Sequence, residues 1–456
     1  MPKLRRLAGY GIGDFGLNIY WNTLSLYLIY WYTTVVGLKP EVAGTIYLIG
    51  MLWDAVSDPV VASLSERVRT KHGTYRPFLL YGSFALGIGF VALFWIPPFQ
   101  GMTLLFVLVA TGILFRTSYT LVAIPYSAMS ARITFSSLER TELSGVRMFF
   151  AFAGLLAVSN LLPPLARHFS GQDQYTASGF QLAITVGAIV ATLSLLACFL
   201  GTSEKPLPAG TQKTPLRLGD LVNALLKNRA LVLLLCVIFL QSGATASIMI
   251  SMVFLIEANQ PVFANKEVIL TGFAIASMCG VPFWTIFIRL FHKKLAWSAA
   301  SFGVAAIGFH LWAFGPLVIH GTPLQIILLG FIMGAFAVLL WSFIPDAVEY
   351  GQITTGGRSE GVVFGSALVV QKMSGGLMGF VVGVMLSAIG YDSSMELQSA
   401  EAAQGLVAFM AICPATLLLI SSCVIWFFPL DRKIHADIIE KLGGAEATPG
   451  APERTG

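Results

Sequence analysis

Long apolar segments alternate with short polar ones along the whole chain, so the hydrophobic pattern is the first guide to its fold. We expect twelve helices, at 10–36, 41–64, 78–97, 102–128, 146–165, 179–200, 229–256, 267–288, 295–315, 322–345, 362–389 and 404–428. Their apolar runs are long enough to cross a bilayer, whose hydrocarbon core takes about 20 residues of helix. The runs are continuous rather than alternating, which excludes a membrane β-barrel. The pattern predicts an all-α membrane protein with twelve transmembrane helices.

The longest polar interval between helices, 201–228, divides the apolar segments into two sets of six. It is rich in proline and basic residues, as expected of a linker. We therefore expect an N-terminal six-helix bundle at 1–200, a cytoplasmic linker at 201–228, a C-terminal six-helix bundle at 229–430 and a partly disordered cytoplasmic tail at 431–456. Two six-helix halves with a site between them near the bilayer midplane resemble the major facilitator fold.

The placement of basic residues predicts the orientation of the chain in the membrane. Of the 28 lysines and arginines, Lys39, Arg167 and Lys266 fall on the side away from the N-terminus, and two more lie inside predicted helices. The remaining 23 fall on the N-terminal side. Cytoplasmic loops carry such an excess of positive charge, so both termini are expected in the cytoplasm.

Composition supports a membrane protein and excludes several other classes. Hydrophobic residues make up 56% of the chain and charged residues only 11%, against about 25% charged in soluble domains. The net charge of +5 is explained by topology and does not indicate nucleic acid binding. The five cysteines lie in or at the ends of apolar segments without metal-type spacing. No catalytic triad or nucleotide-binding glycine loop is found, so we expect no enzyme, no cofactor and no metal site beyond a Na⁺ ion.

Asp54 and Asp58 interrupt the apolar helix at 41–64. They are four residues apart, so they share one face of the helix, one turn from each other. A carboxylate at the centre of a membrane costs about 2.5–3.5 kcal/mol, and such residues usually mark an ion or substrate path. The pair can hold a small cation or share a proton, because two close carboxylates do not readily ionise together. The alternative is a structural pair held by a basic residue of a neighbouring helix.

Two basic residues interrupt other predicted helices. Lys372 is expected either to form a salt bridge that locks the two halves or to be a switchable partner of the aspartates. Arg116 shares a helix face with Thr120, whose hydroxyl is a candidate cation ligand. Arg116 is therefore expected to face the same cavity as the cation site. There it can pair with Asp54, bind an anionic substrate through a bidentate fork, or be purely structural. Asp14 is expected at a different depth and is a poor partner for Arg116.

Several motifs in the right order resemble the glycoside–pentoside–hexuronide:cation symporters, the melibiose-permease group of the major facilitators. The motifs are Tyr10–Gly16, Trp53–Pro59, Ile124–Tyr126, Glu139–Arg140, Pro345–Gly351 and Gly356–Gly361. The resemblance covers nearly the whole chain. It implies a secondary active transporter of a bacterial inner membrane, which symports a sugar or glycoside with Na⁺ or H⁺ by alternating access.

The resemblance also implies roles for single residues. It implies a cation site at Asp54, Ser57, Asp58 and Thr120, with Ser57 standing where the sodium-coupled melibiose permease has an asparagine. It also implies substrate contacts, to which we add Arg116 because of its place on the helix face of Thr120. The expected substrate contacts are Asn18, Arg116, Tyr119, Ala123, Tyr126, Arg147, Trp341 and Lys372. A conformational latch is expected at Arg67, Arg76, Glu139, Arg140, Asp346, Glu349, Arg358 and Glu360.

The chain departs from the permease at the sugar site. The two sugar-anchoring aspartates of the permease correspond to Asn18 and Ala123, and its counterpart of Arg116 is uncharged. Losing two negative charges and gaining one positive charge favours an anionic sugar, such as a hexuronide or a sulfonated sugar. The alternatives are a lysolipid transporter of the same fold and a non-transporting membrane sensor or scaffold. We expect a monomer that is embedded in the lipid bilayer and binds a small-molecule sugar and a coupling cation, but no nucleic acid.

Overall fold

The computed structural model describes residues 3–133, 137–171, 176–204, 228–259, 266–319, 322–355, 360–393, 395 and 397–429. The first helices are α1 (Lys3–Tyr30), α2 (Pro40–Arg67), α3 (Arg76–Leu93), α4 (Gly101–Ile133), α5 (Ser137–Ser170) and α6 (Ala177–Gly201). They are followed by α8 (Arg229–Ala258), α9 (Lys266–Leu290), α10 (Lys293–Phe314), α11 (Leu324–Thr355), α12 (Glu360–Ala388) and α13 (Ala400–Trp426). A π-helical turn, η1 (Trp31–Val35), continues α1, and a hairpin of β1 (Val318–Ile319) and β2 (Thr322–Pro323) precedes α11.

The all-α prediction is confirmed for the part of the chain that the structure describes, which contains twelve α-helices. Eleven of them are long and apolar enough to cross a membrane. α1 falls outside this set because Asp14, Asn18 and Asn22 lower the hydropathy of its middle. Its 28 residues, about 42 Å of helix at 1.5 Å per residue, are nevertheless sufficient to span a bilayer.

Several helices extend beyond the apolar segments that predicted them. α5 begins at Ser137 rather than 146, and α11 ends at Thr355 rather than 345. The hydrogen bonds of a helix are satisfied within it, so polar residues continue the helix past the expected edge of the membrane. The expected linker and tail fall largely on 205–227 and 430–456, which lie outside the described residues.

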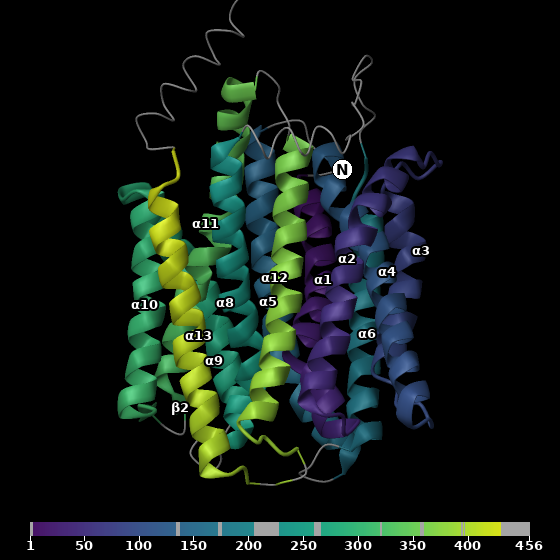
Figure 1. Ribbon diagram of the computed structural model, residues 1–456. Coiled ribbons are helices and arrows are strands. Elements are labelled where there is room, and N and C mark those ends of the chain that lie inside the picture. Colours follow the sequence, from purple (N-terminus) through teal and green to yellow (C-terminus); the bar gives the residue numbers. More distant parts are fainter. Residues whose placement is uncertain are drawn as a thin grey trace, which may run out of the picture.

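The helices stand side by side in one bundle (Figure 1). Most of the described connections between successive helices are short, so successive helices run in opposite directions. The start of α1 and the end of α13 therefore lie at the same end of the bundle, as Figure 1 shows.

Helices α1–α6 meet helices α8–α13 where α2 contacts α12, α5 contacts α9 and α1 contacts α8. The approach of α2 to α12 is close because Gly44 packs against Gly379 and Gly383. A Cβ atom at Gly44 would lie 2.8 Å from the carbonyl oxygen of Gly379, so the contact requires glycine. Nearby, the Tyr30 hydroxyl donates to Glu257 Oε1 at 2.9 Å and joins α1 to α8. These contacts lie at the end of the bundle away from the start of α1.

Candidate functional site

Two carboxylates of α2, Asp54 and Asp58, form the centre of the candidate site. They are only 1% and 5% exposed, respectively. Pro59 follows Asp58 inside the helix, and because proline has no N–H, the carbonyl of Ala55 loses its helical donor. The sequence therefore places two charges and a weakened stretch of helix at one level of the bundle.

Arg116 reaches Asp54 from α4. Its Nη1 lies 2.7 Å from Asp54 Oδ2 and 3.1 Å from the sulfur of Met51. The guanidinium also lies over the ring of Tyr47, 5.4 Å from the centroid. Arg116 is 3% exposed, so the pair is buried. Of the three roles that the sequence left open, the structure shows the pairing with Asp54, and this pairing withdraws Arg116 from a substrate in this conformation.

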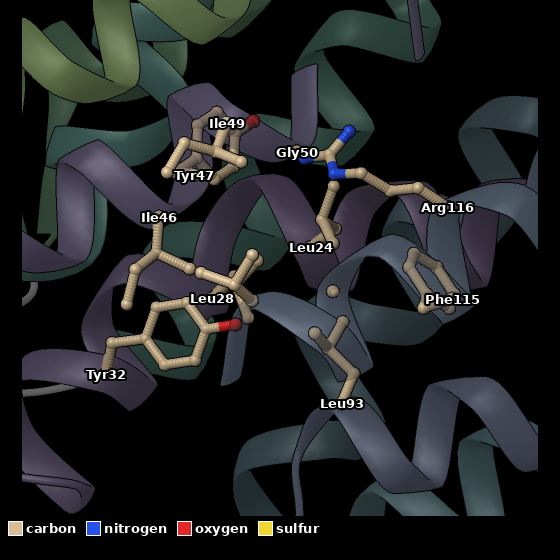
Figure 2. Close-up of a pocket in the computed structure, with 12 residues that line it drawn as sticks. Leu24, Leu28, Tyr32, Ile46, Tyr47, Ile49, Gly50, Leu93, Phe115 and Arg116 are labelled. Carbon is tan, nitrogen blue, oxygen red and sulfur yellow. The ribbon is translucent and has the colours of Figure 1, made fainter. Parts of the chain in front are cut away.

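Gly50 of α2 provides the space through which the Arg116 side chain passes. A Cβ atom at Gly50 would clash with Arg116 Nε and would lie 2.8 Å from Arg116 Cδ. Figure 2 shows the arginine side chain alongside Gly50, at the edge of a small cavity. Most of the cavity lining is apolar, with Leu24, Leu28, Ile46, Ile49 and Leu93 among it. This lining does not suit a polar sugar.

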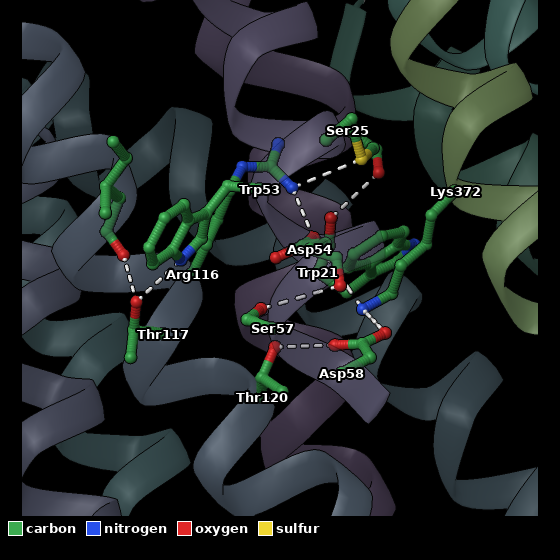
Figure 3. Close-up of polar contacts among 12 residues, drawn as sticks. Trp21, Ser25, Trp53, Asp54, Ser57, Asp58, Arg116, Thr117, Thr120 and Lys372 are labelled. Atoms are coloured by element: carbon green, nitrogen blue, oxygen red, sulfur yellow. Dashed lines mark hydrogen bonds and ion pairs between the residues drawn. The ribbon is translucent and has the colours of Figure 1, made fainter. Parts of the chain in front are cut away.

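Asp58 is held by a hydroxyl and by an amine from two different helices. Thr120 of α4 donates to Asp58 Oδ1 at 2.8 Å. Lys372 of α12 lies with its Nζ 2.5 Å from Asp58 Oδ2 and 3.7 Å from Asp54 Oδ2. Figure 3 shows these groups converging between α2, α4 and α12. As the helical spacing predicted, Arg116 and Thr120 share one face of α4, and both contact the carboxylates of α2.

Ser57 lies between the two aspartates in sequence but turns to its own backbone. Its hydroxyl donates to the carbonyl of Asp54 at 3.5 Å, a long hydrogen bond, and the residue is 8% exposed. The neighbouring Trp53 donates its Nε1–H to the hydroxyl of Thr117 at 2.9 Å. This second bond ties the same segment of α2 to α4.

Two of the expected sugar contacts lie beside this cluster. Tyr119 of α4 faces Trp21 of α1, with 5.7 Å between the ring centroids, and Figure 3 shows Trp21 next to Lys372. Asn18 is one helical turn from Trp21 on α1 and donates its amide to the carbonyl of Asp14 at 2.9 Å. An aromatic pair beside amide and amine groups is suited to a hydroxylated ring, because it offers a stacking face and polar partners.

Arg147 of α5 pairs with Asp14 of α1, with Nη2 3.2 Å from Oδ1. Sequence reasoning missed this pair. A signal for it was available, because Asp14 and Arg147 lie near the same end of their predicted helices and therefore at a similar depth. The side chain of Arg147 is 26% exposed, so one side of it stays accessible.

Tyr126, an expected substrate contact, is not accessible in the conformation seen here. It is completely buried and stacks on Tyr10, with 4.5 Å between the ring centroids. The two tyrosines donate to each other's backbone carbonyls, Tyr126 to Tyr10 at 2.8 Å and Tyr10 to Tyr126 at 3.0 Å. Both hydroxyl groups of the pair are satisfied and join α4 to α1. The role of Tyr126 as a sugar contact stays a prediction.

The two remaining substrate candidates are more exposed. Ala123 is partly buried one turn beyond Tyr119 on α4. Trp341 of α11 is 40% exposed. No contact described here connects Trp341 with the carboxylates of α2, and its role as a sugar contact stays a prediction.

The expected latch residues lie in two separate places. Arg76 donates to the carbonyl of Phe199 at 2.6 Å and covers its ring, which connects α3 to α6. Asp346 pairs with Lys293 of α10 at 2.8 Å. Arg67 is exposed at the end of α2, and Glu349 is partly buried on α11. The contacts of Arg76 and Asp346 are thus made within α1–α6 and within α8–α13.

The other latch candidates fall on parts that the structure does not describe. Arg358 lies outside the described residues, and so do the side chains of Glu139, Arg140 and Glu360. Their expected role stays a prediction.

Comparison with known proteins identifies relatives that match nearly the whole chain. Uncharacterized symporter YnaJ of Bacillus subtilis (strain 168) is 27% identical over 95% of this chain and 94% of its own. Inner membrane symporter YicJ of Escherichia coli (strain K12) is 28% identical, over 92% and 91%. The Glucuronide carrier protein homolog of the same strain is 25% identical, over 96% and 95%.

Solved structures resemble the fold at much lower identity. A structure from work on proton dependent oligopeptide transporters matches with a TM-score of 0.69 at 12% identity, covering 96% of this chain and 100% of that chain. A bacterial homolog of the human lysosomal transporter Spinster matches with a TM-score of 0.67 at 12% identity, covering 93% and 98%. At such identity the likeness shows a common transporter fold and no more.

The family described as MFS/sugar transport protein matches residues 9–432. This match agrees with the resemblance read from the motifs, and its members are transporters, not enzymes. The apolar helices and the inner-membrane relatives identify a multi-pass protein of the bacterial inner membrane. The chain belongs to the MFS/sugar transport protein family.

Proposed function

We propose that this protein is a cation-coupled symporter of a sugar, which works by alternating access between α1–α6 and α8–α13. One observation carries the proposal. Lys372 of α12 forms an ion pair with Asp58 of α2, so a buried charge of one helix set is neutralised by the other. Charges this deep in a membrane protein are costly and are typical of ion and substrate paths.

The ion pair provides a physical link between cation binding and conformational change. When α12 moves away from α2, Lys372 leaves and Asp58 keeps only the hydroxyl of Thr120. An unpaired buried carboxylate is strongly disfavoured, so the rearranged state binds a cation from solution at Asp58. A cation that binds one state better shifts the population toward that state, which couples its gradient to the solute.

The contacts between the helix sets support a conformation closed at one end. Gly44 packs on Gly383, and Tyr30 donates to Glu257, both at the end away from the start of α1. The excess of basic residues supports a cytoplasmic position for the start of α1. On this proposal the structure represents an inward-facing carrier with both termini in the cytoplasm.

For the solute we propose an acidic sugar. A related chain carries the name Glucuronide carrier protein homolog, and glucuronides are acidic. In this protein, Asn18 and Ala123 offer no carboxylate that would repel an anion. Arg116 does not support the proposal, because Asp54 neutralises it. Arg147 is also paired with a carboxylate, that of Asp14, but its side chain is 26% exposed against 4% for Arg116. Asn18 donates to the carbonyl of the same Asp14, so Arg147 is the candidate anion contact.

Uptake by the purified protein in liposomes tests both the cation coupling and the acidic-sugar substrate. We expect uptake of labelled glucuronate-type sugars that depends on a Na⁺ or a pH gradient, and loss of this dependence in Asp58→Asn. Transport of neutral melibiose without competition by glucuronate would contradict the acidic-sugar assignment. Failure to move any sugar under either gradient would contradict the carrier itself.

A further inference from the structure

The two carboxylates of the site are neutralised in different ways. Asp54 is paired with Arg116, and both residues belong to α2 and α4, which contact each other within the first helix set. Asp58 is paired with Lys372, which belongs to α12 of the second set. A movement of α12 relative to α2 separates the second pair and leaves the first intact.

The Arg116–Asp54 pair is built to stay together. The side chain of Arg116 passes the bare backbone at Gly50 and is held by the sulfur of Met51 and the ring of Tyr47. With 3% of Arg116 and 1% of Asp54 exposed, separating them would leave two unpaired buried charges.

The charges can be counted for the state in which Lys372 has left. Asp54, Asp58 and Arg116 then sum to −1, and a single monovalent cation restores neutrality. Without Arg116 the two carboxylates would sum to −2 and would form a stronger site for a mobile cation between them.

We propose that Arg116 is a tethered cation that occupies the Asp54 half of the carboxylate pair. Asp58 alone then binds the coupling cation, and each transport cycle carries one monovalent cation. This inference rests on the proposed function for its meaning in transport, but the binding of the cation can be measured without any solute.

The test is the thermal stability of the purified full-length protein in NaCl or LiCl, compared with choline chloride at equal ionic strength. Arg116→Gly frees Asp54, so we expect a new saturable rise in Tm of about 3 °C or more, or a half-saturating salt concentration at least about ten-fold lower than in the wild type. Adding Asp54→Asn to this variant should abolish the gain, because the vacated carboxylate is then gone.

Two further variants test whether the gain in stability comes from displacing the Arg116 side chain. Gly50→Ala keeps every charge but obstructs the path of Arg116, so we expect a smaller gain in the same direction. Gly112→Ala is the matched control, because a Cβ atom at Gly112 meets no atom of another helix within 4 Å. If Arg116→Gly folds only when Na⁺ or Li⁺ is present, this rescue of folding also counts as the expected stabilisation by the cation.

Two results would overturn the proposal. The first is an Arg116→Gly variant that, folded or not, responds to Na⁺ and Li⁺ no more than the wild type does. The second is a gain that survives the addition of Asp54→Asn, since the cation would then bind elsewhere. Neither result depends on sugar uptake, so a failure of the carrier function is recognised separately.

Discussion

Lys372 Nζ of α12 lies 2.5 Å from Asp58 Oδ2 of α2, and this contact joins the two sets of helices by charge. The same amine lies 3.7 Å from Asp54 Oδ2. Lys372 therefore contributes to the neutralisation of both carboxylates, while the ion pair of Arg116 is with Asp54. Both sides of this contact are largely buried, at 14% exposure for the lysine side chain and 7% for that of Asp58.

Replacing Lys372 by glutamine should leave Asp58 without a cation in this conformation. Removing one partner of a buried ion pair typically costs about 3–5 kcal/mol, and the partial exposure of Lys372 places the expected loss at the lower end. We expect a lower Tm and the loss of coupled uptake, measured by thermal unfolding and by the liposome assay.

The double variant Lys372→Gln with Asp58→Asn is the control for this experiment. It removes both charges, so most of the stability should return while coupling stays absent. A single Lys372→Gln variant that keeps the wild-type Tm and full uptake would show that the pair matters neither to the fold nor to coupling.

Gly383 should be sensitive to the smallest added side chain. A Cβ atom there would clash with the carbonyl oxygen of Pro40 and lie 3.1 Å from Gly44 Cα, at the close contact of α12 with α2. We expect Gly383→Ala to destabilise this conformation by about 1–3 kcal/mol, as overpacking does. Denaturant unfolding of the purified protein measures the change.

Gly365 on the same helix is the matched comparison. A Cβ atom at Gly365 meets no atom of another helix within 4 Å, and alanine favours helix by about 1 kcal/mol over glycine. Gly365→Ala should therefore be neutral or stabilising. If both alanine variants change stability with the same sign and size, the close approach of α12 to α2 does not limit packing.

Tyr126→Phe separates a packing role from sugar contact. The variant keeps the ring stacked on Tyr10 but loses the hydrogen bond to the Tyr10 carbonyl, worth about 0.5–1.5 kcal/mol. We expect a small loss of stability with little change in the apparent sugar affinity. Tyr10→Phe loses the reciprocal bond and should behave alike. A large loss of affinity in Tyr126→Phe alone would support the predicted sugar contact instead.

Glu204 should stabilise the start of α3 from a distance. Its carboxylate accepts the backbone N–H groups of Thr74, Tyr75 and Arg76 at 2.9, 2.7 and 2.8 Å. A carboxylate there satisfies free donors and complements the helix dipole, so Glu204→Ala should cost about 1–2 kcal/mol.

Hydrogen exchange provides the local measurement for Glu204. The amides of Thr74, Tyr75 and Arg76 should exchange faster in Glu204→Ala than in Glu204→Gln, because glutamine keeps an acceptor oxygen. Unchanged exchange at all three amides in Glu204→Ala would mean that the carboxylate does not hold the loop in the membrane-embedded protein.

The sequence predicted much of the fold, because the bilayer imposes a simple rule on it. Each spanning helix must present about 20 apolar residues, and this signal is visible without any tertiary information. The helix ends were predicted less well, since α5 and α11 continue through polar residues that the bilayer does not select. The linker and the tail fall largely outside the described residues and stay predictions.

The candidate site could be predicted in part. Periodicity placed Asp54 and Asp58 on one face of α2, and Arg116 and Thr120 on one face of α4, because side chains four apart in a helix point the same way. Periodicity within one helix does not say which face of another helix it meets. Three roles for Arg116 were therefore open.

The sequence by itself thus determined the membrane class, the helices, the buried charges and the helix faces that carry them. Only the tertiary structure decided how those charges are paired: Arg116 with Asp54, Lys372 with Asp58, and Arg147 with Asp14. The physical reason is that hydropathy and helical period act along one segment, while the partner of a buried charge depends on the depth, rotation and close approach of neighbouring helices. Gly50 is an example, because its missing side chain matters only where Arg116 of another helix passes beside it.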